Sequence, residues 1–234
     1  ELVKLYGQNS LEEAEYIVPI GGDGLLLKSL HNYSKLNKPF FGINFGSIGF
    51  LMNNIINKDL NEIVNHSKKS IFKPLKMSAT SIDNKIFEAY AYNEVSLMRQ
   101  THLASKIKIK INNQIKMEEL ICDGILLSTS AGSTAYNLSA HGSILPLDSN
   151  ILALTPISAF RPRRWRGALL SEINKIEFEV IDNKNRSSSV TADNVEFRNI
   201  SKVNIISSEE NKCTVLFDSK HSIEDKILNE QFNY

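Results

Sequence analysis

The stretch VPIGGDGLLLKSL, residues 18–30, joins an apolar run to a Gly-Gly-Asp-Gly turn and then to leucines at helical spacing. The apolar run predicts a short strand over 16–20, and the leucine spacing predicts a helix over 25–36. Glycines are placed where the backbone bends sharply or approaches another group closely. The stretch therefore predicts a strand that passes into a helix through a tight turn, with the carboxylate of Asp23 among the glycines.

A second strand and a second helix follow in the same order. An apolar strand is predicted over 40–44, after a Lys-Pro turn, and a helix over 58–69 with Leu60, Ile63 and Val64 on its inner face. Alternating strands and helices build a parallel sheet that the helices cover. The first part of the chain is therefore predicted to be an α/β domain.

Further along the chain the hydrophobic period changes from helical spacing to strict alternation. The segments SKIKIKI (105–111) and KIEFEVI (175–181) put charged residues on one side and apolar residues on the other. This pattern predicts mostly antiparallel sheet with one face covered. We therefore expect an α/β domain over 1–69, a β-rich domain over 70–219, and a tail over 220–234 that is partly helical and packs back on the α/β domain.

The chain has 234 residues, with 27 basic and 26 acidic side chains and a formal net charge of +1. This balance gives no field of one sign that favours nucleic acid or a membrane surface. No apolar stretch approaches the roughly 18–20 residues of a membrane-spanning helix. The two cysteines, Cys122 and Cys213, have no metal-binding or disulfide spacing and indicate a reducing cytoplasm. Because the chain begins at Glu1 close to a strand, we expect a further strand and helix to precede it.

The Gly-Gly-Asp-Gly turn admits two interpretations of Asp23. Ligands bind outside the carboxyl ends of strands in open α/β sheets, and a helix N-terminus attracts phosphate. In that place Asp23 can accept a proton from a hydroxyl or hold a metal ion near phosphates. It can equally be a helix N-cap in a tight turn. The turn by itself leaves both interpretations open.

Two further segments suit a nucleotide. GINFGSIGFLMN (42–53) combines three glycines with aromatic residues, which indicates a loop with an apolar lip for a flat ring, although packing alone also explains the aromatic residues. In AYNEVSLM (91–98), Asn93 and Glu94 interrupt an apolar strand. Adjacent strand residues point to opposite faces, so at least one of these polar side chains faces inward and needs a partner. A nucleobase edge and a ribose hydroxyl are suitable partners, and a strand edge facing water is the alternative.

The stretch DGILLSTSAGSTAYNLSAHGSILP, residues 123–146, is rich in small polar residues. A strand ends in a run of hydroxyl residues, and the segment from Gly132 to Tyr136 opens a predicted helix. Donors at a helix N-terminus suit a polar, oxygen-rich ligand, and Tyr136 can stack on its ring. A purely structural loop of this polarity between apolar segments would be unusual, so the sequence favours a binding site here.

Several common catalytic patterns are absent from the sequence. It has no Gly-x-Gly-x-x-Gly fingerprint, no Gly-x4-Gly-Lys-Ser/Thr phosphate loop and no Gly-x-Ser-x-Gly nucleophile turn. A hydride-transferring dehydrogenase and a P-loop kinase are therefore disfavoured. The arginine-rich segment FRPRRWRG (160–167) suits phosphate neutralisation, a solvated loop or a subunit contact.

Together these segments resemble the NAD kinase family, which uses ATP or polyphosphate to make NADP. The resemblance rests on the order and spacing of GGDG at 21–24, GINFGSIGFL at 42–51, NE at 93–94 and DGILLSTSAGSTAYNLSAHG at 123–142. It implies a Rossmann-like α/β domain followed by a β-rich, NAD-binding domain. It also implies a phosphotransferase that acts on the adenosine ribose 2′-hydroxyl of NAD. The expected partners are NAD and ATP, with a divalent ion, usually magnesium, in a homodimer or homotetramer.

The resemblance also implies roles for individual residues. Asp23 is expected to be the general base that takes the proton from the 2′-hydroxyl, and no residue is assigned to the metal. The other residues expected to contact NAD are Gly24, Phe50, Asn93, Glu94, Asp123, Ala131, Thr134, Ala135, Tyr136, Asn137, Leu138, Ser139 and Ser158.

The sequence departs from the family pattern at several positions. Leu25 follows GGDG in place of a polar or aromatic residue, and Ala131 stands where Thr is usual. The segment Asp193-Asn194-Val195 lacks the usual glutamine. These departures bear on the phosphoryl donor, which stays open between ATP and polyphosphate. Two other functions also stay open: a lipid kinase with the same GGDG turn, and a non-catalytic sensor of NAD or NADPH.

Overall fold

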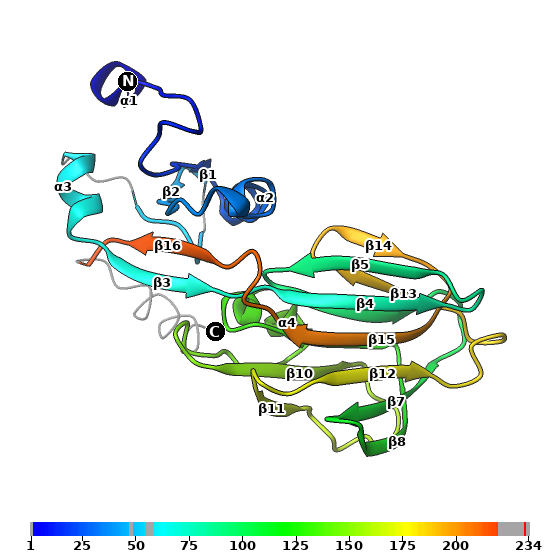
Figure 1. Ribbon diagram of the computed structural model, residues 1–234. Helices are drawn as coiled ribbons and strands as arrows, with labels where there is room; N and C mark the ends of the chain where they lie inside the picture. Colours follow the sequence, from blue (N-terminus) through cyan, green and yellow to red (C-terminus); the bar gives the residue numbers. More distant parts are fainter. Residues whose placement is uncertain (1, 47–48, 55–58, 220–231, 233–234) are drawn as a thin grey trace. The chain divides into compact units, whose positions relative to one another are not determined.

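The computed structural model describes residues 2–46, 49–54, 59–219 and 232. The partly helical tail predicted over 220–234 lies outside these residues except for residue 232. The chain divides into two compact units, one comprising residues 1–72 and 211–234 and the other residues 73–210 (Figure 1).

The first unit is a small α/β arrangement. Its elements are α1 (Leu2–Tyr6), β1 (Ile20–Gly21), α2 (Asp23–Tyr33), the 3₁₀-helix η1 (Ser34–Leu36), β2 (Ile43–Asn44), α3 (Leu60–Asn65), β3 (Lys68–Phe72) and β16 (Cys213–Phe217). Strands β1 and β2 pair in parallel. Phe40 forms parallel bridges to Ile17 and Val215, and β16 pairs with β3 in antiparallel fashion. The predicted α/β character is confirmed, although the strands are shorter than the apolar runs predicted.

Helix α2 forms because its apolar residues fall on one face. Leu26 and Leu30, one turn apart, are buried, whereas Leu25 is exposed. The helix begins at Asp23, earlier than predicted, because Gly22 with an extended backbone is its N-cap. It ends at Tyr33 and passes into η1.

The helix predicted over 58–69 is shorter in the structure. Helix α3 begins after Asp59, whose carboxylate accepts a hydrogen bond from the Asn61 N–H at 2.9 Å. Beyond α3 exposed and buried residues alternate, and Ser70 and Phe72 are the buried ones. Strand β3 pairs along its length with β16. Because of this pairing β16 belongs to the first unit, whereas the prediction assigned residues up to 219 to the β-rich domain.

The second unit contains two six-stranded sheets. Their strand orders are β5-β4-β15-β12-β7-β8 and β11-β10-β9-β6-β13-β14, and all the pairings within them are antiparallel. The strands are β4 (Leu75–Ser81), β5 (Ile86–Ala91), β6 (Glu94–Arg99), β7 (Ser105–Ile111), β8 (Gln114–Cys122), β9 (Gly124–Ser128), β10 (Ile151–Ile157), β11 (Ala168–Ser171), β12 (Ile176–Val180), β13 (Ser188–Ala192), β14 (Val195–Phe197) and β15 (Ile200–Ser207). Two short helices, η2 (Ala131–Thr134) and α4 (Tyr136–Ser139), follow β9.

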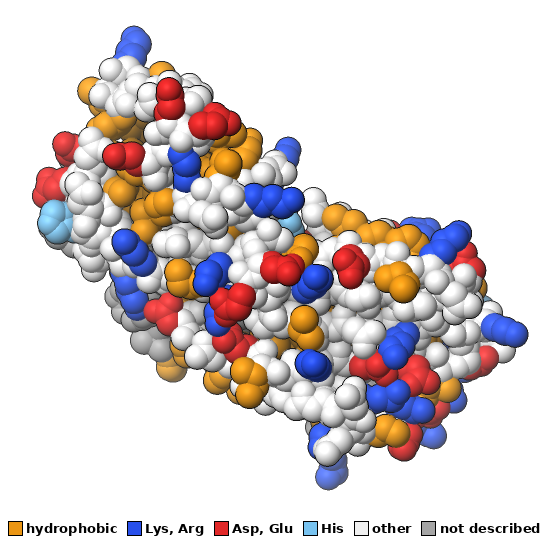
Figure 2. Space-filling view, viewed as in Figure 1, with side chains coloured by type: hydrophobic (Ala, Val, Ile, Leu, Met, Phe, Trp, Pro, Cys, Tyr) orange, Lys and Arg blue, Asp and Glu red, His pale blue; other side chains and the backbone are white. Residues whose placement is uncertain are grey.

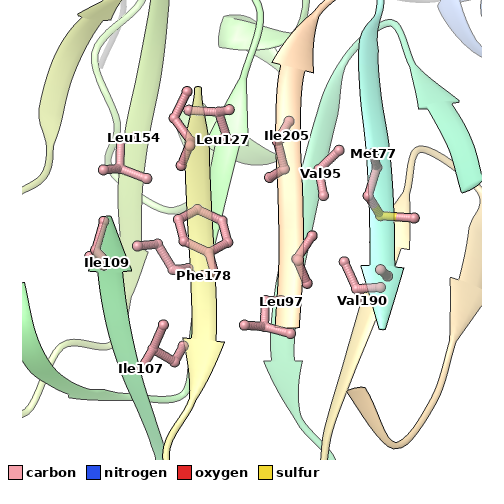
Figure 3. Close-up of a cluster of buried hydrophobic side chains, with 14 of the residues drawn as sticks. Met77, Val95, Leu97, Ile107, Ile109, Leu127, Leu154, Phe178, Val190 and Ile205 are labelled. Carbon is pink, nitrogen blue, oxygen red and sulfur yellow. The ribbon is translucent and has the colours of Figure 1, made fainter. Parts of the chain in front are cut away.

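The core of the second unit lies between its two sheets. Figure 3 shows Met77, Phe178 and Ile205 of one sheet directed toward Val95 and Leu97 of the other. The alternation predicted for 105–111 and 175–181 is confirmed, because the apolar side chains of β7 and β12 enter this core. Their charged neighbours form the mixed blue and red area over β7, β8 and β12 in Figure 2. This packing fixes the ends of β6, β9 and β10, beside which the predicted site residues of this unit lie.

Candidate active site

In the first unit, the Gly-Gly-Asp-Gly turn ends β1 and starts α2. Gly22 is the N-cap and makes no side-chain cap bond, and Asp23 is the first helical residue. The two oxygens of the Asp23 carboxylate accept backbone N–H groups of Phe50 at 2.8 Å and Leu51 at 3.0 Å. The N-cap interpretation of Asp23 is therefore wrong: its carboxylate joins the helix start to the glycine loop.

The glycine loop, residues 42–51, contacts this turn by close backbone approach. The Phe45 N–H donates to the carbonyl oxygen of Gly21 at 2.9 Å. A Cβ added to Gly42 would lie 2.4 Å from the sulfur of Met52, so this position accepts only glycine without rearrangement. At Gly24, in contrast, an added Cβ would meet no atom within 4 Å. The last glycine of the turn thus faces open space in the first unit, which leaves room for a ligand.

In the second unit, the Asn93–Glu94 pair packs directly against the Gly-Ser-Thr-Ala-Tyr block. A Cβ added to Gly132 would lie 2.3 Å from the carbonyl oxygen of Asn93. The Thr129 N–H donates to that same oxygen at 2.9 Å. The structure therefore brings together two of the predicted motifs, and Gly132 is required because any side chain there would displace the Asn93 backbone.

Glu94 is the most perturbed carboxyl group of this site. Its Oε2 atom is buried and has no hydrogen-bond partner among the described residues. Burial, and then the nearby Asp193 carboxylate, raise the pKa of Glu94 to about 7, while the Tyr136 backbone N–H opposes the shift. A buried carboxylate oxygen without a donor is the atom that a ligand hydroxyl would satisfy.

Hydrogen bonds of buried side chains hold the Gly-Ser-Thr-Ala-Tyr block in place. The Asn137 amide donates to the carbonyl oxygens of Ser133 at 3.0 Å and Ser143 at 2.9 Å, and its oxygen accepts from Thr155 Oγ1 at 2.7 Å. Asn137 has no exposed surface. It was predicted to contact NAD, but its side chain is used inside the unit and holds the loop.

Sequence reasoning missed Ser133 and Thr129 as supports of this block. The hydroxyl of Ser133 donates to the Ser130 carbonyl oxygen at 2.7 Å and accepts from the Leu145 N–H at 3.0 Å. Thr129 Oγ1 accepts from the Gly132 N–H at 3.0 Å. Their small size and hydroxyl group in a long polar loop were the available signal, but nothing in the spacing of the residues indicates their partners.

The remaining predicted residues of the block differ in exposure. Ala131 is buried, whereas Tyr136 is 36% exposed and Ser139 is exposed. Thr134, Ala135 and Leu138 are half-buried. The helix predicted after Gly132 is reduced to η2 and the short α4, so the block is mainly a loop.

Tyr136 lies near a second carboxylate, Asp123. Burial, then Glu94 and Asp123, raise the pKa of the Tyr136 phenol. Asp123 is paired with Arg99, whose Nε lies 2.6 Å from Asp123 Oδ1. Ser158, with a left-handed φ of 50°, follows the end of β10 beside this pair, since Ile157 accepts from the Asp123 N–H. Tyr136 therefore stands near Glu94 and Asp123, the two carboxylates of this unit that are expected to contact NAD.

The described residues give less support to a metal site, a membrane-spanning helix or a phosphate site in the arginine-rich segment. Within it, no three His, Cys, Asp or Glu side chains gather as a metal site requires. No helix of the described ranges is both long and apolar enough to cross a membrane. In the arginine-rich segment, the Arg163 guanidinium lies 4.9 Å from the centre of the Phe160 ring, so part of this charge stacks on the segment's own aromatic side chain.

Comparison with known proteins gives matches to one family. Residues 92–217 match the family model described as ATP-NAD kinase C-terminal domain. The chain is 50% identical over 232 residues to the NAD kinase of Rickettsia felis, covering 99% of this chain and 91% of the relative. The NAD kinase of Rickettsia canadensis is 49% identical over 232 residues, with the same coverage.

Two solved structures share the fold. A yeast NADH kinase complexed with NADH has a TM-score of 0.81 at 20% identity, covering 95% of this chain and 67% of the yeast chain. An NAD kinase from Archaeoglobus fulgidus in complex with ATP has a TM-score of 0.75 at 24% identity, covering 98% of this chain and 90% of the archaeal one. At these identities the two structures establish the fold alone.

Proposed function

This chain belongs to the NAD kinase family, and we propose which of its residues bind NAD and which one acts as the base when NAD is phosphorylated. The reaction moves a phosphoryl group to the adenosine ribose 2′-hydroxyl of NAD and yields NADP. The family membership favours this reaction over the lipid kinase and the non-catalytic sensor that the sequence left open.

In the proposed reaction, Asp23 is the general base. The ribose 2′-oxygen attacks the terminal phosphorus of the donor, its proton passes to the Asp23 carboxylate, and the bond from that phosphorus to the donor's bridging oxygen breaks. The observation that carries the proposal is the carboxylate at the start of α2, fixed by the Phe50 and Leu51 N–H groups with open space at Gly24. A carboxylate has about four acceptor sites, so the two N–H bonds do not by themselves exclude a hydrogen bond from the ribose. Gly24 and Phe50 are the proposed neighbours of the ligand in this unit.

The second unit is proposed to supply most contacts to NAD. The buried Oε2 of Glu94, without a partner among the described residues, suits a ribose hydroxyl as its donor. Asn93 suits a nucleobase edge or an amide, and the partly exposed ring of Tyr136 suits stacking. The further proposed contacts are Asp123, Ala131, Thr134, Ala135, Leu138, Ser139 and Ser158.

For the phosphoryl donor we propose ATP, with polyphosphate as the second candidate. The N-terminus of α2 carries partial positive charge that favours phosphate, and the related archaeal structure was solved with ATP. Magnesium neutralises phosphate oxygens in such transfers. Because the described residues offer no cluster of metal ligands, we assign no step to it.

We further propose a homodimer or homotetramer that works in the cytoplasm, with neither nucleic acid nor membrane as a partner. Neither Cys122 nor Cys213 forms a disulfide within the described part of the chain, and both are buried, which suits a reducing compartment. Sedimentation velocity of the purified protein measures the oligomeric state.

The experiment that tests the proposal is NADP formation by the purified protein. NAD and magnesium are supplied with ATP or with polyphosphate, and the product is read by cycling with an NADP-specific dehydrogenase. We expect NADP with ATP, and omission of magnesium should reduce it strongly. Binding of NAD without product from either donor would contradict catalysis by this chain. Product from polyphosphate alone would reject ATP as the donor.

A further inference from the structure

The turn between β13 and β14 holds an aspartate to which the proposed function assigns no part. Asp193 has a left-handed φ of 50°, a backbone conformation that Asp tolerates better than most residues. Its Oδ2 accepts the Tyr92 N–H at 2.7 Å, and its Oδ1 accepts the N–H groups of Asn93 at 3.0 Å and Glu94 at 3.2 Å. A single carboxylate thus binds three successive backbone amides of the segment that carries the predicted NAD contacts.

The carbonyl groups of the same segment are also bound. Thr129 Oγ1 donates to the Tyr92 oxygen at 2.6 Å, and the Thr129 N–H donates to the Asn93 oxygen at 2.9 Å. The Asp193 N–H donates to the Glu94 oxygen at 3.1 Å. Every backbone N–H and C=O of Tyr92–Glu94 therefore has a partner inside the unit, so the backbone is fixed and recognition is left to the side chains of Asn93 and Glu94.

The acceptor for the three amides has to be a carboxylate. Hydrogen bonds to an ionised oxygen are roughly twice as strong as neutral ones, and both Asp193 oxygens are used as acceptors. An asparagine would present one NH₂ group to the same amides, and a donor cannot accept their hydrogen bonds. The clamp therefore depends on the acid, not only on the shape of the side chain.

Asp193 also acts on Glu94 through its charge. The groups that face the Glu94 carboxyl are Asp193 from the β13–β14 turn and Tyr136, by its backbone N–H and its phenol, from α4. The negative charge of Asp193 favours the protonated form of Glu94, whereas the Tyr136 N–H favours the ionised form. The ionisation of Glu94 thus depends on Asp193, the same residue that binds the Glu94 backbone N–H.

We propose that Asp193 is a positioning residue for NAD, which clamps the Tyr92–Glu94 backbone so that the side chains of Asn93 and Glu94 are presented to the ligand. The inference rests on the proposed contacts of Asn93 and Glu94 with NAD. Asp193 is not itself a ligand contact, and it acts through the three amides. Its loss should therefore weaken the binding of NAD more than it slows the transfer step, for which Asp23 is the proposed base.

The test compares Asp193→Asn with a matched control, Asp182→Asn. Asp182 also has a left-handed φ, 57°, in a turn of the same unit, but its carboxylate accepts from Asn185 and lies near Arg186. We expect Asp193→Asn to raise the KM for NAD on the order of tenfold or more and to change kcat by less than about threefold, since hydrogen bonds to a charged group are lost. The control should keep both constants, and thermal unfolding should show that both variants are folded.

The pH profile separates positioning from a general loss of structure. If ionised Glu94 accepts a ribose hydroxyl, kcat/KM for NAD in the wild type rises with pH through the pKa of about 7. Asp193→Asn removes the repulsion between the Asp193 and Glu94 carboxylates, which lowers the pKa of Glu94. The rise in kcat/KM should therefore occur at lower pH. In a Glu94→Gln background there is no such ionisation, and Asp193→Asn should then cause no further shift.

The possible outcomes lead to distinct conclusions. An active wild type with unchanged KM and pH profile in Asp193→Asn would overturn the inference and leave the kinase proposal intact. A lower melting temperature with kcat and KM both affected and the profile unmoved would make Asp193 merely structural, and would also overturn it. A wild type and control that both form no NADP would contradict the proposed function instead.

Discussion

Two aspartates, one in each unit, use the same physical device for different purposes. Asp23 accepts two backbone N–H groups of the glycine loop, and Asp193 accepts three of the Tyr92–Glu94 segment. At Asp23 the backbone holds the carboxylate that we propose as the general base. At Asp193 the carboxylate holds the backbone segment that we propose to bind NAD. The role of a carboxylate that accepts backbone N–H groups thus depends on whether the carboxylate itself or the backbone segment it holds is proposed to meet the ligand.

The scaffolds around the two aspartates also differ. The first unit has β1 and β2 of two residues each and a small cluster of Phe41, Ile43, Leu60 and Leu216. The second has two six-stranded sheets around one extensive core. The residues proposed to bind NAD thus rest mostly on the unit with the two six-stranded sheets. Each of the following changes tests a part of this comparison.

Asp23→Asn should have the largest effect. Removing the proposed general base is expected to lower kcat by about 10²–10⁴-fold while the KM for NAD changes by less than about threefold. Steady-state NADP formation measures both constants. Asp59→Asn in the same unit is the matched control, because Asn caps α3 as well as Asp does. An unchanged kcat in Asp23→Asn would make Asp23 a clamp of the glycine loop, like Asp193, and not the base.

Phe178→Ala compares the packing of the two units. Phe178 has no exposed surface and lies in the large core, so its loss should cost about 3–5 kcal/mol of unfolding free energy. Phe41→Ala in the smaller cluster should cost less, because fewer neighbours lose contacts. Denaturant unfolding measures both costs. An equal or greater loss at Phe41 would contradict the contrast between the scaffolds.

Glu94→Gln tests the electrostatic state of the binding segment. A carboxyl pKa raised from 4.5 to about 7 means that the folded state binds the proton more tightly than the unfolded state. Stability should therefore be lost as pH rises from about 4.5 to about 7, by on the order of 3 kcal/mol. Without NAD, Glu94→Gln should melt higher than the wild type at pH 8 and equally at pH 4. If the difference in melting temperature between Glu94→Gln and the wild type were the same at pH 8 and pH 4, burial would not control the pKa of Glu94.

Lys110→Gln should have the smallest effect. Lys110 pairs with Glu177 at 2.8 Å and Glu179 at 3.0 Å on the outer face of the second unit. Because solvent screens such pairs, the melting temperature should fall by at most about 3 °C at low salt and still less at high salt. A large loss of NADP formation would instead assign this outer face a part in function.

The predicted fold agrees with the structure where periodicity is strong. The segment 105–111 reads as alternating Lys and Ile and is β7 over the whole of that range, because strand period and burial coincide there. The first unit was predicted less well. Residues 68 and 69 were assigned to the end of a helix but begin β3, because their pairing with β16 arises from residues far along the chain.

The candidate site was found in the sequence only where glycines or unusual polar residues marked it. GGDG, Asn93-Glu94 and the Gly-Ser-Thr-Ala-Tyr block stand out from apolar surroundings. The clamp by Asp193 does not, since it joins residues 100 positions apart and its turn looks like any hairpin turn. The inward position of Asn137 was also missed, because a polar residue inside a polar loop gives no sign of its direction.

The sequence alone determined the local chemistry of this protein: where strands pass into helices, where the backbone needs glycine, and which family the motifs indicate. These features depend on neighbours a few residues apart, so spacing reveals them. Only the tertiary structure decided that the Asp23 carboxylate faces the glycine loop, that the Oε2 atom of Glu94 is buried without a donor among the described residues, and that Asp193 holds the Glu94 backbone. These features depend on pairings between distant segments, and the energies of burial and hydrogen bonding exist only once those segments meet.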